Sequence, residues 1–502
     1  MTIPKEVKKV ILSLEKAGFK AYVVGGCTRD FLQDIEPNDW DIATSARPEE
    51  IQKIFPDNFY ENAFLTVTIL TKNRNPRLKE IEITTFRSEA KYTDKRHPDE
   101  IRFAKTLKED LARRDFTINA IALKIPDTRY PPSPKLRRAG KILDTKYSVN
   151  DPFNGQKDLK DRIIRAVGDP NERFNEDALR LMRAARLATA LNFKIEPKTK
   201  QAIIKNASLL KLISKERIRD EFIKTIMTAE AAKGIELLHE LGLLEFVAPE
   251  LEEGINVSQN KHHTYNCWDH NVLSLDYAAK KGFGLEVRLA SLFHDIGKPR
   301  AKRGQGPNAT FYNHEVIGAR MAQEILERLK FPRELAGKIV LLVRYHLFYY
   351  NVGEVGESSV RRLVRNVGLE NFQQLLEVRM SDRIGSGVPK AEPYKLRHLK
   401  YMAEKVSQDP LSAKMLKVDG NDVMEALKIK PGPKVGQVLS VLLELVIEDP
   451  KNNKKDYLKK EISRLGALSD KELGRLAEKA EREVQDIEQK KDEMTKEKYW
   501  VT

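Results

Sequence analysis

The segment Ala21-Tyr22-Val23-Val24-Gly25-Gly26-Cys27-Thr28-Arg29-Asp30 joins a short apolar run to a glycine pair and a polar turn. The apolar run predicts a buried strand, and the residues after it predict the start of a helix. Paired glycines let the backbone approach an anion closely, and a helix start presents free N–H groups to phosphate. Gly25, Gly26 and Arg29 are therefore candidate phosphate-binding residues, although a glycine turn beside a surface arginine is common without that role.

Asp39-Trp40-Asp41 follows shortly after this turn, in a stretch that alternates like a strand up to Ala43. Residues two apart on a strand point to the same side, so Asp39 and Asp41 would present paired carboxylates. Such a pair repels itself, and Mg²⁺ relieves the repulsion when it binds carboxylates together with substrate phosphates. Two ions could activate a 3′ hydroxyl and stabilise a leaving pyrophosphate. Glu82, on a further predicted strand, is either a third acid of this group or an outward charge.

A second polar cluster, Arg113-Arg114-Asp115-Phe116-Thr117-Ile118-Asn119-Ala120, stands at a predicted helix start. Its two cations, its acid and its amide suit a triphosphate and ribose hydroxyls, which makes Arg113, Arg114, Asp115 and Asn119 candidate nucleotide-binding residues. The alternative is a capping cluster on a basic surface.

Glu176-Asp177-Ala178-Leu179-Arg180 lies in a run that we expect to be helical, so Asp177 and Arg180 would share a face. They form either an ordinary ion pair or a protein surrogate for a template base. A carboxylate accepts from the amino group of C or A, and a guanidinium donates to ring acceptors. Uracil and guanine present a carbonyl instead and would be rejected. Arg183 and Arg186 extend the same helix toward nucleotide or RNA.

Histidines concentrate in the middle of the chain, where six of nine fall between residues 262 and 346. His294-Asp295 ends an apolar helix-like stretch, and burying such a pair is costly unless metal or hydrogen bonds satisfy it. With His270 upstream and Asp382 downstream, the order His … His-Asp … Asp resembles the metal site of HD phosphohydrolases. The resemblance implies that these residues bind a metal, and His314 and His346 resemble the extra ligands of members with two metals. The alternative is a fold that has lost its metal and serves as a scaffold.

The composition describes a long basic chain of 502 residues with a formal net charge of +15. This length suggests about two to four domains, and the charge favours a polyanionic partner over simple solubility. No apolar run is long enough to cross a bilayer, and the first residues do not read as a signal peptide. Two cysteines exclude a disulfide framework, so we expect a cytoplasmic protein. The first part reads as mixed α/β, and the chain beyond about residue 155 reads as helical; residues 475–498 predict a solvated helix or a frayed tail.

The ordered motifs Gly-Gly-x-x-Arg-Asp, Asp-x-Asp, Thr-Thr-Phe-Arg and Arg-Arg-Asp-Phe-Thr-x-Asn-Ala resemble the bacterial-type tRNA nucleotidyltransferase and poly(A) polymerase family. That family belongs to the polymerase-β-type nucleotidyltransferases. The resemblance implies that Asp39 and Asp41 bind the catalytic Mg²⁺, that the glycine loop holds the triphosphate, and that Glu-Asp-x-x-Arg selects the base. The run Glu216–Glu221 resembles a structural motif of the family. The histidine pattern resembles an HD phosphohydrolase site holding a divalent metal of unspecified identity.

The resemblance also predicts the architecture, namely a mixed-sheet nucleotidyltransferase head followed by all-α parts. We expect the head at 1–145, a helical neck and body at 146–250, an HD domain at 251–395 and a tRNA-binding helical tail at 396–502. A polar segment containing Tyr92 and Asp94 matches the loop that assists the family's switch from C to A addition.

The predicted function is template-independent addition of C and A, from CTP and ATP, to the tRNA acceptor end. Alternatives are a bacterial poly(A) polymerase, an enzyme that adds only CC or only A, an HD phosphohydrolase with a nucleotide-sensing head, and a non-catalytic RNA-binding protein. The predicted metals are Mg²⁺ in the head and a divalent ion in the HD domain. We expect no membrane partner, and the sequence leaves the oligomeric state open.

Overall fold

The computed structural model describes residues 2–61, 66–90, 100–125, 147–260, 264–407 and 412–501. The chain forms two compact units, Met1–Arg344 with Ser381–Val388, and Tyr345–Met380 with Pro389–Thr502. The four expected domain boundaries stay predictions, and the one at 145/146 lies outside the described residues, as do Tyr92 and Asp94.

Within the described residues of the first unit, the largest sheet has seven strands in the order β3-β4-β5-β2-β1-β8-β9. Strands β2 and β5 are parallel, and every other neighbouring pair is antiparallel. The strands are β1 (Ala21–Val24), β2 (Asp41–Thr44), β3 (Asn58–Glu61), β4 (Thr66–Leu70), β5 (Glu80–Thr85), β8 (Ala122–Lys124) and β9 (Ser148–Asn150). A separate ribbon pairs β6 (Arg87–Ala90) with β7 (Glu100–Phe103). The predicted mixed sheet is therefore confirmed.

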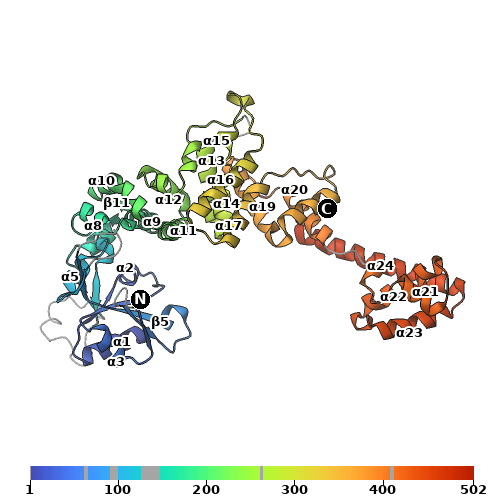
Figure 1. Cartoon of the computed structure of the whole chain (residues 1–502), viewed down its shortest axis with the longest axis horizontal. Helices are drawn as coiled ribbons and strands as arrows, with labels where there is room; N and C mark the ends of the chain where they lie inside the picture. Colours follow the sequence, from blue (N-terminus) through green and yellow to red (C-terminus); the bar gives the residue numbers. More distant parts are fainter. Residues whose placement is uncertain are drawn as a thin grey trace, which may run out of the picture. The chain divides into compact units, whose positions relative to one another are not determined.

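One face of this sheet is covered by α1 (Lys5–Lys16) and α3 (Pro48–Ile54), as Figure 1 shows. The apolar side chains of α1 recur at helical spacing and are buried against the strands. A second, smaller core lies on the other side and includes Phe86 and Leu111, the latter from α5 (Leu107–Ala112). With both faces packed, the ends of β1 and β2 are held firmly in place.

The helices after the head are α7 (Gly155–Asp161), α8 (Pro170–Glu176), α9 (Leu179–Leu191), α10 (Pro197–Asn206), α11 (Lys215–Ile226) and α12 (Ala231–Glu240). The expectation of one helical run through residues 176–180 is wrong, because α8 ends at Glu176 and Asp177 is extended. The Asp177 side chain accepts a hydrogen bond from the backbone N–H of Leu179 at 3.0 Å. An aspartate in this position satisfies a free donor at the start of the next helix, which favours two helices over one.

The histidine-rich region of the first unit contains α13 (Cys267–Lys280), α14 (Leu285–Phe293), α15 (Lys298–Ala301), α16 (His314–Arg328) and α17 (Arg333–Tyr345). The end of α19 (Leu369–Gly385) also belongs to this unit. Gly297 lies where α14 gives way to α15, and a Cβ there would stand 2.3 Å from the carbonyl oxygen of His314. Only glycine permits this approach, which brings the start of α16 against the turn that follows α14.

The second unit contains α18 (Glu357–Val367), α20 (Tyr394–Ser407), α21 (Gly420–Leu427), α22 (Pro433–Glu448), α23 (Lys455–Gly466) and α24 (Asp470–Tyr499). Its α24 packs against both α22 and α20, and it buries Leu473, Ala477 and Ala480 in a core with α21–α23. The helix predicted over residues 475–498 is confirmed, and the frayed-tail alternative is wrong. Tyr401 of α20 donates to Asp492 of α24 at 2.5 Å.

None of the described helices is both long enough and apolar enough to span a membrane.

Candidate functional site

Three carboxylates gather at one edge of the head sheet. Asp41 is the first residue of β2, and it lies opposite Val24 of β1 and in register with Glu82 of β5. Asp39 precedes the strand in a bend and is exposed. Because cross-strand neighbours share a face, Glu82 belongs to the same edge as Asp41. The geometry therefore favours Glu82 as a third acid of the group over an isolated outward charge.

Burial and mutual repulsion raise the pKa values of two of these acids, Asp41 and Glu82. Burial, followed by the charges of Asp39 and Glu82, raises the pKa of Asp41 to about 7, while Arg114 opposes the shift. Burial and the charge of Asp39 also raise the pKa of Glu82. A divalent cation relieves this repulsion, so the oxygen donors fit the Mg²⁺ that the sequence predicts.

Gly25 leaves room for the acid that faces it. Its φ of +84° is a conformation that residues with side chains rarely adopt. A Cβ at this position would lie 2.8 Å from Oδ2 of Asp41 and 3.2 Å from Nη1 of Arg114. The glycine thus allows the Asp41 carboxylate and the Arg114 guanidinium to converge over the turn between β1 and α2 (Gly26–Leu32).

Cys27 is a site residue that the sequence did not reveal. Its buried Sγ donates to the carbonyl oxygen of Val24 at 3.0 Å and accepts from the backbone N–H of Asp41 at 3.4 Å. The thiol joins the end of β1 to the start of β2. Burial, followed by the charge of Asp41, raises its pKa well above the usual range, which makes the thiol unreactive. A buried cysteine has no sequence pattern that marks this role.

The candidate phosphate and ribose residues form a continuous polar chain. Arg29 donates to Oδ1 of Asn119 at 3.1 Å, and Asn119 donates to Oδ1 of Asp115 at 3.2 Å. Arg183, on α9, donates through Nε and Nη2 to Oδ2 of Asp115 at 2.9 and 2.6 Å. Burial alone would raise the pKa of Asp115, but Arg183 holds it well below its usual range. The structure thus links four of the predicted residues, from the glycine turn to the neck.

Arg113 and Arg114 share a buried acid, Asp110. Arg113 donates to Oδ1 of Asp110 through Nε and Nη2 at 3.1 and 2.9 Å, and Arg114 Nη2 lies 3.4 Å from Oδ2. Asp110 therefore fixes both guanidinium groups beside the sheet edge. An acid three residues before the first arginine was a helical-spacing signal that could have identified it.

Asp177 and Arg180 are brought to the same site, but they do not pair with each other. Asp177 binds Arg217 of α11 at 2.8 Å, and Arg180 binds Glu176 at 2.7 Å. Arg180 also donates to the backbone carbonyls of Arg173 and Arg113 at 3.2 and 3.0 Å. The ordinary ion-pair interpretation of the motif is therefore wrong, because each member has a partner of its own.

These partners leave hydrogen-bonding capacity for a ligand. The three hydrogen bonds of Arg180 use three of its five N–H groups. The carboxylate of Asp177 accepts one bond on each oxygen. Both side chains are thus held in place, while Arg180 keeps N–H donors and Asp177 keeps oxygen lone pairs that a ligand can use.

Arg186 occupies a different environment from Arg183. Its Nε donates to Oε2 of the buried Glu221 at 2.6 Å, which ties α9 to α11. Together with the Arg217–Asp177 pair, this contact joins the run Glu216–Glu221 to the neck, and the structural role expected for that run stays a prediction.

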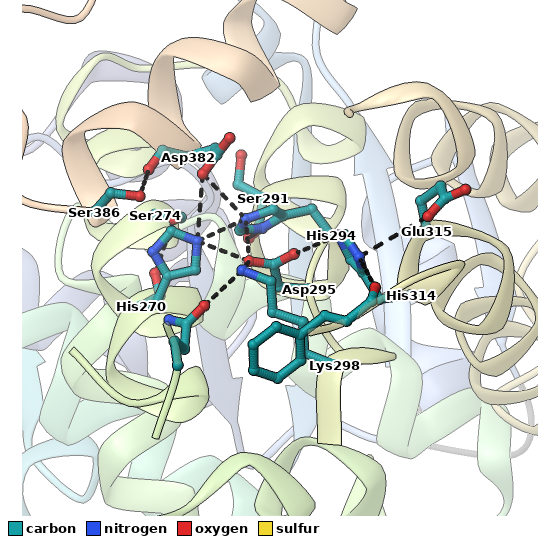
Figure 2. A network of polar contacts seen from close by, with 12 residues as sticks. His270, Ser274, Ser291, His294, Asp295, Lys298, His314, Glu315, Asp382 and Ser386 are labelled. Carbon is teal, nitrogen blue, oxygen red and sulfur yellow. Dashed lines mark hydrogen bonds and ion pairs between the residues drawn. The ribbon is translucent and has the colours of Figure 1, made fainter. Parts of the chain in front are cut away.

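A second candidate site lies in the histidine-rich region, where side chains from four segments converge (Figure 2). Nε2 of His270 lies 2.9 Å from Nε2 of His294 and 3.0 Å from Oδ2 of Asp295. Oδ1 of Asp382 is 3.4 Å from His270 Nε2 and 3.7 Å from His294 Nε2. Nε2 of His314 is 3.2 Å from Oδ1 of Asp295. All five side chains are buried.

This arrangement fits a metal ion. Neighbouring ligands in a shell of about 2.1 Å radius lie roughly 3.0–3.5 Å apart, close to the separations observed. Nδ1 of His294 donates to the carbonyl of Ser291 at 2.8 Å, and Nδ1 of His314 donates to that of Phe311 at 2.7 Å. These bonds direct each Nε2 lone pair into the cluster. Burial disfavours a protonated His294, but Asp295 and Asp382 raise its pKa to about 10, so the cluster attracts a cation.

Lys298 and His346 are two further buried residues of the histidine-rich region. Lys298 is buried, and its Nζ lies 2.5 Å from Oδ2 of Asp295 and from Oε1 of Gln259. His346 is buried in the second unit, and its role as an additional ligand stays a prediction.

Comparison with known proteins gives a consistent assignment. Residues 21–165 match the poly(A) polymerase head domain, residues 192–255 match the probable RNA and SrmB-binding site of polymerase A, and residues 267–418 match the HD domain. The fold and the carboxylate edge thus define a nucleotidyltransferase that carries an HD domain.

Relatives identify the family. The CCA-adding enzyme of Enterococcus faecalis is 32% identical over 463 residues, which cover 91% of this chain and 96% of that protein. The Geobacillus sp. CCA-adding enzyme is 32% identical, over 89% of this chain and 94% of that protein. The Bacillus stearothermophilus CCA-adding enzyme in complex with CTP has a TM-score of 0.58 and 26% identity, covering 92% of this chain and 98% of that one. The chain belongs to the family of CCA-adding enzymes.

The Thermotoga maritima CCA-adding enzyme complexed with tRNA has the same fold, with a TM-score of 0.52 and 20% identity over 92% of this chain and 95% of that one. The predicted family and fold class are both confirmed.

Proposed function

We propose that this protein adds C and A from CTP and ATP to the 3′ end of tRNA, without a nucleic-acid template. Membership of the CCA-adding enzyme family supports the reaction class. The observation that carries the assignment is the link between Arg180 and the carbonyl of Arg113, next to the arginine that faces Asp41. It places the residues proposed to choose the base beside the carboxylates proposed to support the chemistry.

In the proposed mechanism, Asp39 and Asp41 would hold Mg²⁺, with Glu82 as a flanking acid. Bound Mg²⁺ would lower the pKa of the RNA 3′ hydroxyl and offset the charge of the triphosphate. Gly25 and Gly26 let the triphosphate approach the backbone, and Arg29 and Arg114 provide cations beside it.

The remaining site residues orient the nucleotide. Asn119 connects Arg29 to Asp115, and Asp115 in turn fixes Arg183. Asp177 accepts a hydrogen bond from the exocyclic amino group of C or A, and Arg180 donates to a ring acceptor. Arg113 is held by Asp110 beside this site, and its carbonyl accepts a hydrogen bond from Arg180. The basic helical parts bind the tRNA acceptor end through backbone phosphates and shape.

The test is extension of tRNA that lacks its CCA end, with Mg²⁺ and CTP or ATP singly and together, read at nucleotide resolution. We expect three added residues in the order C, C, A. A long A tail would identify a poly(A) polymerase, and a product that stops after CC would identify a split-function enzyme. Asp41→Asn should abolish extension, whereas Asp57→Asn, which changes an exposed acid of the same head, should not.

The buried His270–His294–Asp295–Asp382 cluster favours a second activity, metal-dependent phosphoester hydrolysis by the HD domain. A bound divalent metal would activate water for attack on phosphorus, as in cleaning a damaged tRNA 3′ end. The four side chains would hold the ion, and Nε2 of His314 lies 3.2 Å from the other carboxylate oxygen of Asp295. The test combines the metal content of the purified protein with hydrolysis of 2′,3′-cyclic phosphates, and His294→Ala should remove both signals.

The proposed location is the cytoplasm. Both cysteines are buried free thiols, which suits a reducing compartment, and the substrates proposed above are available there.

A further inference from the structure

We propose that Arg217, on α11, is a specificity-determining residue that holds the Asp177 carboxylate in the orientation needed to tell C and A from U and G. This inference rests on the base-selection role proposed for Asp177.

The Asp177 side chain is held by hydrogen bonds from two different helices. With φ −136° and ψ 104°, this residue is extended between α8 and α9, so its backbone belongs to neither helix. Two donors fix its side chain. The N–H of Leu179 binds Oδ1 at 3.0 Å from the start of α9, and Nη2 of Arg217 binds Oδ2 at 2.8 Å from α11. Each oxygen retains a lone pair, which remains available to an incoming amino group.

Selection of the base depends on this anchoring. The amino group of C or A donates to the carboxylate, whereas the carbonyl of U or G meets it as a second acceptor and is repelled. A carboxylate that can rotate would turn away from the carbonyl and relieve the repulsion. The bond to Arg217 opposes that rotation, so the penalty against U and G is retained.

Arg217 also has a donor to spare. Among the residues that the structure describes, its buried Nη1 has no hydrogen-bond partner. A buried donor without a partner lowers the stability of the fold, so its presence in a native structure calls for an explanation. A ligand that accepts a hydrogen bond from this donor would provide one. A nucleotide seated against Asp177 would bring acceptors next to the same guanidinium. Lysine at this position would keep the charge but lose the planar fork.

The chain provides a matched control on the same helix. Arg219 is similarly exposed, at 20% against 24% for Arg217, but it pairs with Asp220 and with the carbonyl of Lys330. Its removal tests loss of an α11 arginine without a change at Asp177.

The experiment measures kcat/KM for CTP and UTP on tRNA lacking CCA, and for ATP and GTP on tRNA ending in CC, together with thermal unfolding. We expect Arg217→Met to lower both selectivity ratios by roughly 10- to 100-fold, because the variant would lose discrimination comparable to that of one good base contact. Arg217→Lys should restore part of the selectivity, and Arg219→Met should leave both ratios unchanged.

Two results would overturn the proposal: one would exclude only the role of Arg217, and the other would exclude the role of Asp177 as well. If Arg217→Met and Arg217→Lys fold and keep the wild-type ratios while Asp177→Ala loses them, Arg217 has no part in selection. If Asp177→Ala also keeps the ratios, the base-selection role itself is wrong.

Discussion

Gly25→Ala is the substitution that most directly tests the geometry of the carboxylate edge. The new methyl group would be built 2.8 Å from Oδ2 of Asp41, closer than a carbon and an oxygen normally approach. The Asp41 carboxylate would have to move by about half an ångström or more, since a packed interior transmits such strain. A misplacement that approaches about 1 Å in a catalytic group costs on the order of 100-fold in kcat.

The same substitution also strains the backbone. At φ +84° and ψ −149°, a residue with a side chain costs about 1–3 kcal/mol. Gly18 separates the two effects, because its φ is +93° and a Cβ there would meet nothing within 4 Å. Gly18→Ala should therefore reduce stability while leaving catalysis unchanged.

The assay is the initial rate of CTP incorporation at saturating tRNA, with urea unfolding of each variant. We expect both alanine variants to be destabilised, and only Gly25→Ala to lose about two orders of magnitude in kcat. A Gly25→Ala variant that folds to the same extent as Gly18→Ala and keeps kcat within about twofold of the wild type would show that the Asp41 carboxylate does not depend on the space at Gly25.

Three further predictions concern other parts of the chain. Because Arg183 lowers the pKa of Asp115 in the folded protein, the ionised carboxylate stabilises the fold above its ordinary pKa of about 4, and this contribution disappears as the pH falls further. The difference in unfolding free energy between wild type and Asp115→Asn should thus be constant from about pH 5 to 7 and should decrease below about pH 4. A difference that does not change with pH would contradict this expectation. His294→Ala should remove the divalent metal bound by the HD cluster, measured by elemental analysis, while tRNA extension persists; unchanged metal content would exclude the cluster as the binding site. Tyr401→Phe should destabilise the protein by about 0.5–1.5 kcal/mol, since the hydroxyl that binds Asp492 is lost; equal urea midpoints for the two proteins would argue against that bond.

The sequence was most informative where chemistry requires a fixed spacing along the chain. The glycine turn, Asp39 and Asp41 were predicted from local patterns, and the structure places them at one sheet edge. Glu82 could be left only as an alternative, because its position beside Asp41 depends on the parallel pairing of β2 with β5. A strand pairing between distant segments is not encoded in either strand alone.

Contacts between helices were least predictable. Asp177 and Arg180 read naturally as a pair, yet their partners are Arg217 and Glu176. The Glu176–Arg180 spacing of four was visible in the sequence, whereas Arg217 comes from another helix and carried no local signal. The break at Asp177 also had a signal, since aspartate is favoured at helix starts.

The packing of α24 sets an order of events during synthesis. Its last turns hold Tyr401, Glu404 and Lys405 of α20 through Asp492, Lys498 and Tyr499. The part of α24 that packs on α20 is therefore synthesised about 90 residues after α20 itself, which takes roughly 5–20 seconds on a translating ribosome. Throughout that interval one face of α20 lies open, whereas the head sheet and its carboxylate edge have all their strands and can already fold.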